Sequence, residues 1–83
     1  MVVGDAGELS IALAHFQEMR ESGEFCCLEI LSDYHYVWGV AYVRDDREVG
    51  AKHERHTVGL FNKGTLVEAL EEAYTEWKAG RLA

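Results

Sequence analysis

Three short apolar segments with the character of β-strands stand between two stretches of helical periodicity, and these five segments fill most of an 83-residue chain. A chain of this length fits one domain, and glycines near the segment ends separate the segments, while proline is absent. Sequential strands joined by short turns pair as an antiparallel meander, and two amphipathic helices can then cover one of its faces. The sequence therefore predicts a single α+β domain over residues 1–83, a two-layer sandwich with the order α-β-β-β-α and both helices on one face of the sheet.

The first helix is predicted from about Ala6 to Ser22. Asp5 followed three residues later by Glu8 is a variant of the capping box, and Gly23 is a natural stop after the last turn. Apolar residues recur at three- and four-residue spacing, which is typical of one buried helical stripe. The stripe consists of Leu9, Ala12, Leu13, Phe16 and Met19.

The second helix is predicted more strongly, beginning after Thr65 and ending at Ala79 before Gly80. Thr65 and Glu68 form a capping box at its start. Its apolar stripe consists of Leu66, Leu70, Ala73 and Trp77, with Val67 and Tyr74 beside them. The other side of this helix carries a row of acidic residues that we expect to point to solvent, namely Glu68, Glu72 and Glu76, with Glu71 alongside.

Strands are predicted over about Glu24–Leu31, Tyr36–Arg44 and His56–Phe61, and residues 49–55 fit either a mobile loop or the start of the last strand. Alternation in the middle strand places large aromatic side chains on one face and small residues on the other. Gly39 and Ala41 leave room for a helix to pack closely, which would put the aromatics on an uncovered face. The alternative is that the aromatic side chains form the core. The large-residue face consists of Tyr36, Trp38, Val40 and Tyr42.

Charge constrains the kind of partner. The chain has 15 acidic residues against 8 Lys and Arg, a formal net charge of −7, and both terminal segments are acidic. Nucleic-acid-binding proteins usually present a basic face, so direct nucleic-acid binding is disfavoured and a protein partner with a basic surface is favoured. No apolar run approaches the length of about 20 residues that a membrane span needs, so no membrane contact is expected.

Residues with chemical reactivity are few and poorly placed for catalysis. Cys26 and Cys27 are adjacent, so a disulfide between them would be strained, and we expect a reducing, cytoplasmic setting. His53 and His56 have a spacing unlike the usual zinc-ligand patterns, and the glycine-containing segments do not match a phosphate-binding loop. We therefore assign no catalytic, cofactor-binding or metal-binding residue, and expect the protein not to be an enzyme.

Two families share local or topological features with this chain. The α-β-β-β-α order resembles double-stranded RNA-binding domains, which carry a lysine-rich cluster where this chain has Lys63 alone before Gly64–Glu68. That resemblance implies a similar fold with lost or altered RNA binding. The stretch from Gly64 to Leu70 resembles the helix entry of HicB-type antitoxins, which implies an antitoxin-like or regulatory module.

In size, acidity and lack of catalytic residues, the chain is similar in style to small phage proteins such as the anti-CRISPR inhibitors. This similarity implies a non-enzymatic inhibitor from a phage or mobile element that occludes a basic surface of a host nucleic-acid-handling complex. A homodimer through the uncovered sheet face or a sheet edge is an alternative assembly. The residues expected to bind a partner are Glu68, Glu71, Glu72, Glu76, Tyr36, Trp38 and Tyr42.

Overall fold

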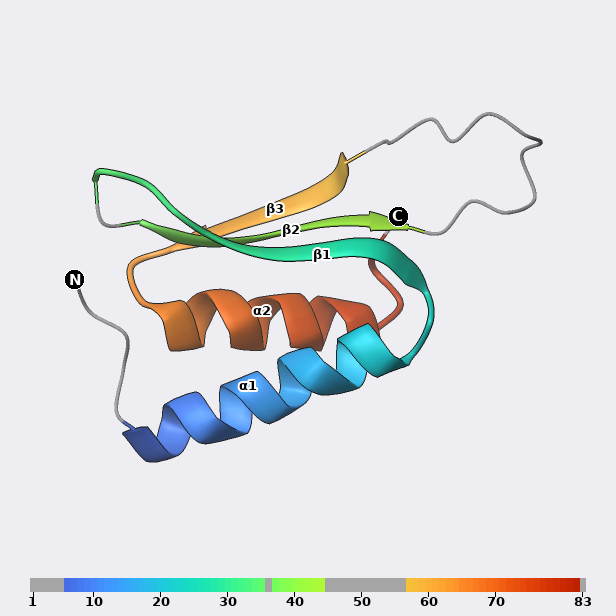
Figure 1. Cartoon of the computed structure of the whole chain (residues 1–83), viewed down its shortest axis with the longest axis horizontal. Coiled ribbons are helices and arrows are strands. Elements are labelled where there is room, and N and C mark those ends of the chain that lie inside the picture. Colours follow the sequence, from blue (N-terminus) through green and yellow to red (C-terminus); the bar gives the residue numbers. More distant parts are fainter. Residues whose placement is uncertain (1–5, 36, 45–56, 83) are drawn as a thin grey trace.

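The predicted order and class are confirmed by a computed structural model, which describes residues 6–35, 37–44 and 57–82. Two helices lie on one face of a three-stranded antiparallel sheet (Figure 1). The elements in chain order are α1 (Ala6–Glu21), β1 (Phe25–Ser32), β2 (Trp38–Arg44), β3 (Thr57–Lys63) and α2 (Leu66–Lys78). Asp5 and the ambiguous residues 49–55 lie outside the described residues.

The sheet has β2 at its centre, between β1 and β3. Ile30 of β1, Val40 of β2 and Phe61 of β3 lie side by side across it, and all three contribute to the core. A bulge at the start of β1, between Phe25 and Cys27, shifts the pairing with β2. From Cys27 to Ser32 the register is regular, so alternate side chains of β1 point to opposite faces of the sheet.

Helix α2 begins and ends where its local chemistry predicts. Thr65 is its N-cap: the Glu68 amide donates to Thr65 Oγ1 (3.1 Å), and Thr65 Oγ1 donates to the Glu68 carboxylate (3.0 Å). Gly80 follows the C-cap with φ +72°, a left-handed conformation that glycine adopts without strain. The predicted stripe residues Leu66, Leu70 and Ala73 are buried, and Ala69 is buried with them.

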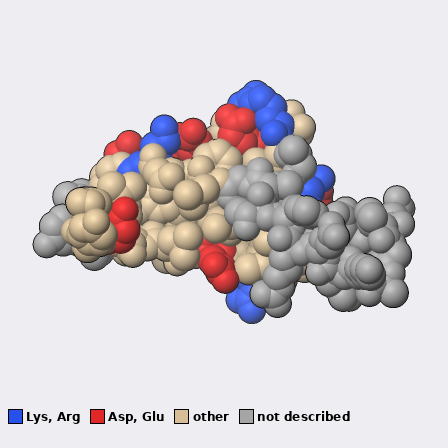
Figure 2. All heavy atoms as spheres, turned by 90° about the horizontal axis from the view of Figure 1, so that it is seen from above, with Lys and Arg blue, Asp and Glu red and all other residues tan. Residues whose placement is uncertain are grey.

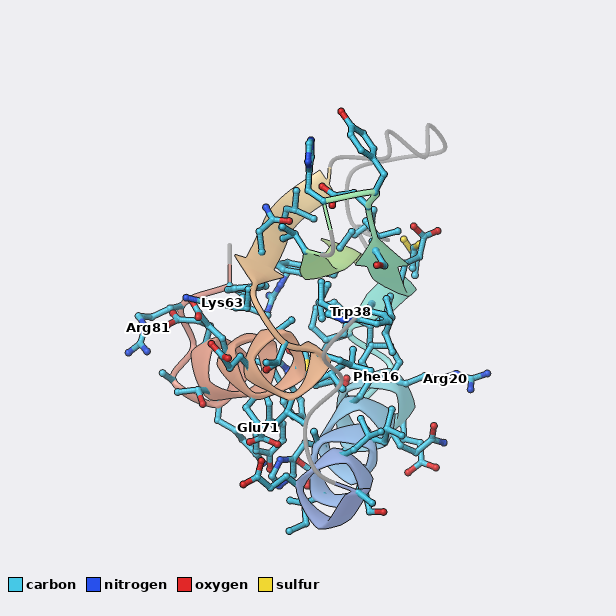
Figure 3. All side chains as sticks on the ribbon, turned by 90° about the vertical axis from the view of Figure 1, so that its left-hand side faces the viewer. Phe16, Arg20, Trp38, Lys63, Glu71 and Arg81 are labelled. Atoms are coloured by element: carbon cyan, nitrogen blue, oxygen red, sulfur yellow. The ribbon has the colours of Figure 1, made fainter. Side chains whose placement is uncertain are left out.

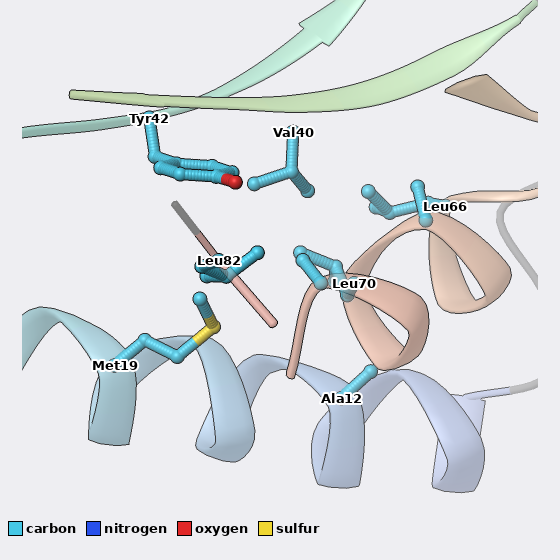
Figure 4. Close-up of a cluster of buried hydrophobic side chains, with 9 residues drawn as sticks. Ala12, Met19, Val40, Tyr42, Leu66, Leu70 and Leu82 are labelled. Carbon is cyan, nitrogen blue, oxygen red and sulfur yellow. The ribbon is translucent and has the colours of Figure 1, made fainter. Parts of the chain in front are cut away.

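The core lies between the sheet and both helices (Figure 4). Its largest fully buried side chains are Met19 of α1, Val40 of β2 and Leu70 of α2. Leu82, just after α2, is 6% exposed and closes one side of this cluster. Helix α1 packs mainly on α2 and touches β1 only slightly, so α2 forms most of the layer beneath the sheet (Figures 1 and 3).

Strand boundaries differ from the predicted ones by one or two residues. β2 begins at Trp38 rather than Tyr36, because Asp33 organises a turn that reaches as far as Val37. The Asp33 carboxylate accepts hydrogen bonds from the amides of His35 (2.8 Å) and Val37 (3.3 Å), which are the contacts of an Asx turn. β3 ends at Lys63 rather than Phe61, so this strand runs almost to the N-cap of α2.

Candidate functional site: the open face of the sheet

The acidic row of α2 is largely paired within the chain. Lys63 reaches Glu72, Arg81 makes two hydrogen bonds to Glu76, and His15 Nδ1 of α1 lies 2.7 Å from Glu71 Oε1. Glu68 is exposed and its carboxylate accepts the hydrogen bond from Thr65. These four residues lie off the buried stripe, as the sequence predicts. Glu72 and Glu76 are each paired with a cation of the same chain, which lowers their attraction for a basic protein.

The electrostatics of this row reflect those pairs. Hydrogen bonding to Arg81 lowers the pKa of Glu76, and hydrogen bonding to Glu72 raises the pKa of Lys63. Lys63 is the single lysine at the position where double-stranded RNA-binding domains have a basic cluster. Its ammonium group is paired with the carboxylate of Glu72.

The aromatic residues of β2 belong to the core. Tyr42 is 2% exposed and packs edge-on against Phe25, and Trp38 packs against the core cluster. Tyr36 lies outside the described residues. The alternative in which the aromatic face is covered is therefore the one that the structure shows, and a residue as buried as Tyr42 cannot meet a partner without disrupting the core. Burial also raises the pKa of Tyr42.

The opposite sheet face is covered by no described helix, and we call it the open face. It follows from the register, because residues that alternate with the core side chains point the other way. Viewed from this side, the described surface is uncharged over its middle, with acidic and basic residues at the margins (Figure 2). The open face consists of Cys27, Glu29 and Leu31 of β1, Gly39, Ala41 and Val43 of β2, and Leu60 and Asn62 of β3.

Two leucines of this face, one on each outer strand, have exposed side chains. Leu31 is 41% exposed and Leu60 is 53% exposed, whereas Gly39 and Val43 on the central strand are buried. A Cβ atom at Gly39 would lie 2.8 Å from the Phe61 carbonyl oxygen and 3.4 Å from Leu60 Cδ1. Gly39 therefore lets Leu60 and β3 lie close to β2, rather than making room for a helix as expected from the sequence.

The size of the open face limits what it can hold alone. Its central strand has seven residues and the sheet has three strands. With about 3.4 Å per residue and about 4.8 Å between strands, the footprint is roughly 300–400 Å². A stable protein interface buries about 800 Å² on each partner. The face is therefore large enough to be the apolar centre of an interface and too small to be all of it.

The turn between β1 and β2 adds an exposed aromatic group at one end of the sheet. Tyr34 is 84% exposed, and its ring lies 4.0 Å from the ring of His35. The Asx turn of Asp33 fixes the backbone that carries both rings. Exposed tyrosines near an apolar patch are typical anchors of protein interfaces.

Cys26 and Cys27 lie at the start of β1. Neither Cys26 nor Cys27 forms a disulfide, and Cys26 Sγ lies 3.5 Å from the carbonyl oxygens of Val43 and Arg44. In the described part of the chain, no group of three or more His, Cys, Asp or Glu side chains could hold a metal ion. His53 and His56 lie outside the described residues. Among the described helices, none has the length and apolar character required to span a membrane.

Comparison with family profiles, with curated proteins and with solved structures finds no match to this chain. Sequence reasoning predicted an uncovered sheet face but not the residues that form it, because the alternation in β2 identifies two faces but does not say which one the helices cover. Leu31 and Leu60 could have been found by pairing the strands in register once the core face was known.

Proposed function

We propose that this chain is a non-enzymatic protein-binding domain whose open face meets the apolar centre of a partner's basic surface. The observation that carries the proposal is the exposure of Leu31 and Leu60 on one sheet face of a small acidic protein. Apolar groups concentrated on one face mark interaction sites more often than apolar groups scattered singly.

Charge favours a basic partner. Four of the five Lys and Arg residues in the described part of the chain are ion-paired to carboxylates of the same chain, and the fifth, Arg20, points away from the body of the molecule (Figure 3). Acidic residues are in surplus, and Glu29 of the open face has no ion pair with a described residue. Excess negative charge around an apolar patch speeds association with a basic surface and disfavours acidic competitors.

In this proposal the domain acts by occupying the basic surface of its partner. A basic protein surface is commonly one that receives nucleic acid, so a bound acidic domain would exclude that ligand. Inhibition of a host nucleic-acid-handling complex by a phage or mobile-element protein is the specific form that we propose, in the cytoplasm. The support for that compartment is that a disulfide between the adjacent Cys26 and Cys27 would be strained.

The test is affinity capture from a lysate with three immobilised proteins. The first is the wild type, the second carries Leu31→Asn and Leu60→Asn, and the third carries Ile11→Asn and Leu13→Asn on α1. Ile11 and Leu13 are 58% and 42% exposed, close to the 53% of Leu60 and 41% of Leu31, so the α1 variant is a matched control for lost apolar surface.

We expect the wild type and the α1 variant to retain the same basic protein and the open-face variant to lose it. Raising the salt from about 0.1 to about 0.5 M should release much of that protein, because exposed charges are then screened over a shorter distance. Equal retention by all three proteins, or loss with the α1 variant alone, would show that the open face is not the binding surface.

A further inference from the structure

β1 is an edge strand whose outer backbone edge pairs with no described segment. Its one neighbour in the sheet is β2, and its only other element contact among the described helices and strands is a slight one with α1. The outward N–H and C=O groups of such a strand can pair with an added strand. The register with β2 is regular from Cys27 to Ser32, so no bulge interrupts this part of the edge.

This edge lacks most of the protection that exposed strands usually have. Edge strands are commonly blocked by lysine, proline or a bulge. Residues 24–33 contain no lysine, arginine or proline, and the bulge of β1 lies at its beginning, between Phe25 and Cys27. The other edge strand, β3, ends in Lys63. Of the two described edges, β1 is therefore the one better suited to an added strand.

The charge along β1 selects the kind of strand that can be added. Glu24, Glu29 and Asp33 are the charged residues of this segment, and Glu29 lies near the middle of the strand. Antiparallel pairing of β1 with a second copy of itself would bring the two Glu29 side chains close together, and like charges on adjacent strands are destabilising. A lysine or arginine facing Glu29 is stabilising instead.

We infer that β1 binds an extended segment of the protein partner as a fourth strand, with a basic residue beside Glu29 and apolar residues beside Cys27 and Leu31. This inference rests on the proposed function. It also addresses the size of the interface, because an added strand would extend the open face sideways while its main chain forms hydrogen bonds with β1. Specificity then comes from the alternate side chains that lie over the open face.

The probe is a peptide about ten residues long in which every second residue is threonine and the residues between read valine, lysine, valine at the centre; we call it the lysine–valine peptide. Because side chains alternate between the two faces of a strand, one of its faces can place lysine beside Glu29 and valine beside Cys27 and Leu31. The control peptide has proline in place of each threonine, because it has the same charge and cannot pair as a strand. Binding is followed by amide chemical shifts and hydrogen exchange of the whole protein. We expect the lysine–valine peptide to shift and protect amides of residues 27–32 and to leave those of β3 unchanged.

Two variants separate strand pairing from general charge attraction. Glu29→Lys and Glu8→Lys change the net charge equally, and both residues are exposed, but Glu8 lies at the far end of α1. Glu29→Lys should weaken binding of the lysine–valine peptide by roughly fivefold or more, and Glu8→Lys by less than about twofold.

Three outcomes would overturn the inference: equal binding of both peptides, an equal effect of both substitutions, or a concentration-dependent dimer that buries β1 without peptide. The experiments can disprove the inference without disproving the proposed function, and the reverse. If no peptide binds β1 while capture of the partner still requires Leu31 and Leu60, the added strand is wrong and the open-face proposal stands. If the peptide binds β1 while the open-face variant still captures the partner, the open-face proposal is wrong.

Discussion

The two faces of the sheet receive alternate residues from the same strands, yet they differ sharply in exposure. On the helix-covered face, Val40 is fully buried and Tyr42 is 2% exposed. On the open face, Leu31 and Leu60 are 41% and 53% exposed. The covered face therefore supplies the packing that holds the domain together, and the open face has apolar side chains that folding does not use. Apolar surface unused in folding is the surface that remains for a partner.

The largest expected effect is a loss of stability from a substitution in the core beneath the helix-covered face. Leu70→Ala removes a side chain that is 1% exposed, so it should lower the free energy of unfolding by about 2–5 kcal/mol. Leu60→Ala makes the same chemical change at a side chain that is 53% exposed, and should lower it by less than about 1 kcal/mol. Urea unfolding followed by circular dichroism measures both. Equal losses would mean that the open face is part of the folding core.

A smaller effect is expected at the central strand, where the open face is most tightly built. Gly39→Ala places a Cβ 2.8 Å from the Phe61 carbonyl oxygen, and should destabilise the protein by about 1–3 kcal/mol. Gly64→Ala is the matched control, because no atom lies within 4 Å of its added Cβ, and it should be neutral or stabilising by about 0.4–1 kcal/mol. Thermal unfolding of both variants checks the difference. A neutral Gly39→Ala would contradict the close approach of β3 to β2.

The smallest expected effect is on the pH dependence of stability, at the contact between α1 and α2. Glu18 accepts hydrogen bonds from the Tyr74 hydroxyl and from Lys78, and both lower its pKa. The hydrogen bond between Tyr74 and Glu18 also raises the pKa of Tyr74. A carboxyl whose pKa is lowered by folding stabilises the protein above its unfolded pKa, near 4.5 here, and loses that contribution as the pH falls through the folded value.

The melting temperature should therefore fall less between pH 6 and pH 3 in Glu18→Gln than in the wild type. Tyr74→Phe, which removes the main hydrogen-bond donor, should reproduce part of this change. An unchanged pH dependence in both variants would show that the seam between α1 and α2 does not depend on Glu18.

Sequence reasoning succeeds for elements whose boundaries are determined by residues close together in the chain. Helix α2 begins at a Thr65–Glu68 capping box and ends before Gly80, and both features act through residues a few positions apart. The strand order also follows from short connections and period-two patterns. Three of the four predicted stripe residues of α2 are buried, Trp77 is only partly buried, and the buried Ala69 was missed. On α1 the prediction for Leu13 was wrong, because this side chain is 42% exposed.

Sequence reasoning fails for features that depend on packing between segments far apart in the chain. The face that α2 covers depends on how the layers assemble, and the small size of Gly39 turned out to serve the neighbouring strand. The pairing of Glu71 with His15 joins residues 56 positions apart, and the pairing of Glu72 with Lys63 depends on how β3 leads into α2. For this reason the acidic row looked available to a partner in the sequence and is mostly paired in the structure.

We propose that the open face, rather than α2 or α1, meets the partner. The most direct measurement is a titration of the captured partner into the isotope-labelled protein, followed by the methyl resonances of Leu31, Leu60, Ile11 and Leu13. These side chains form two pairs of matched exposure on different elements. We expect the methyl groups of Leu31 and Leu60 to shift on binding and those of Ile11 and Leu13 to stay unchanged. Shifts confined to Ile11 and Leu13, or to residues beside Glu68 and Glu76 on α2, would contradict it.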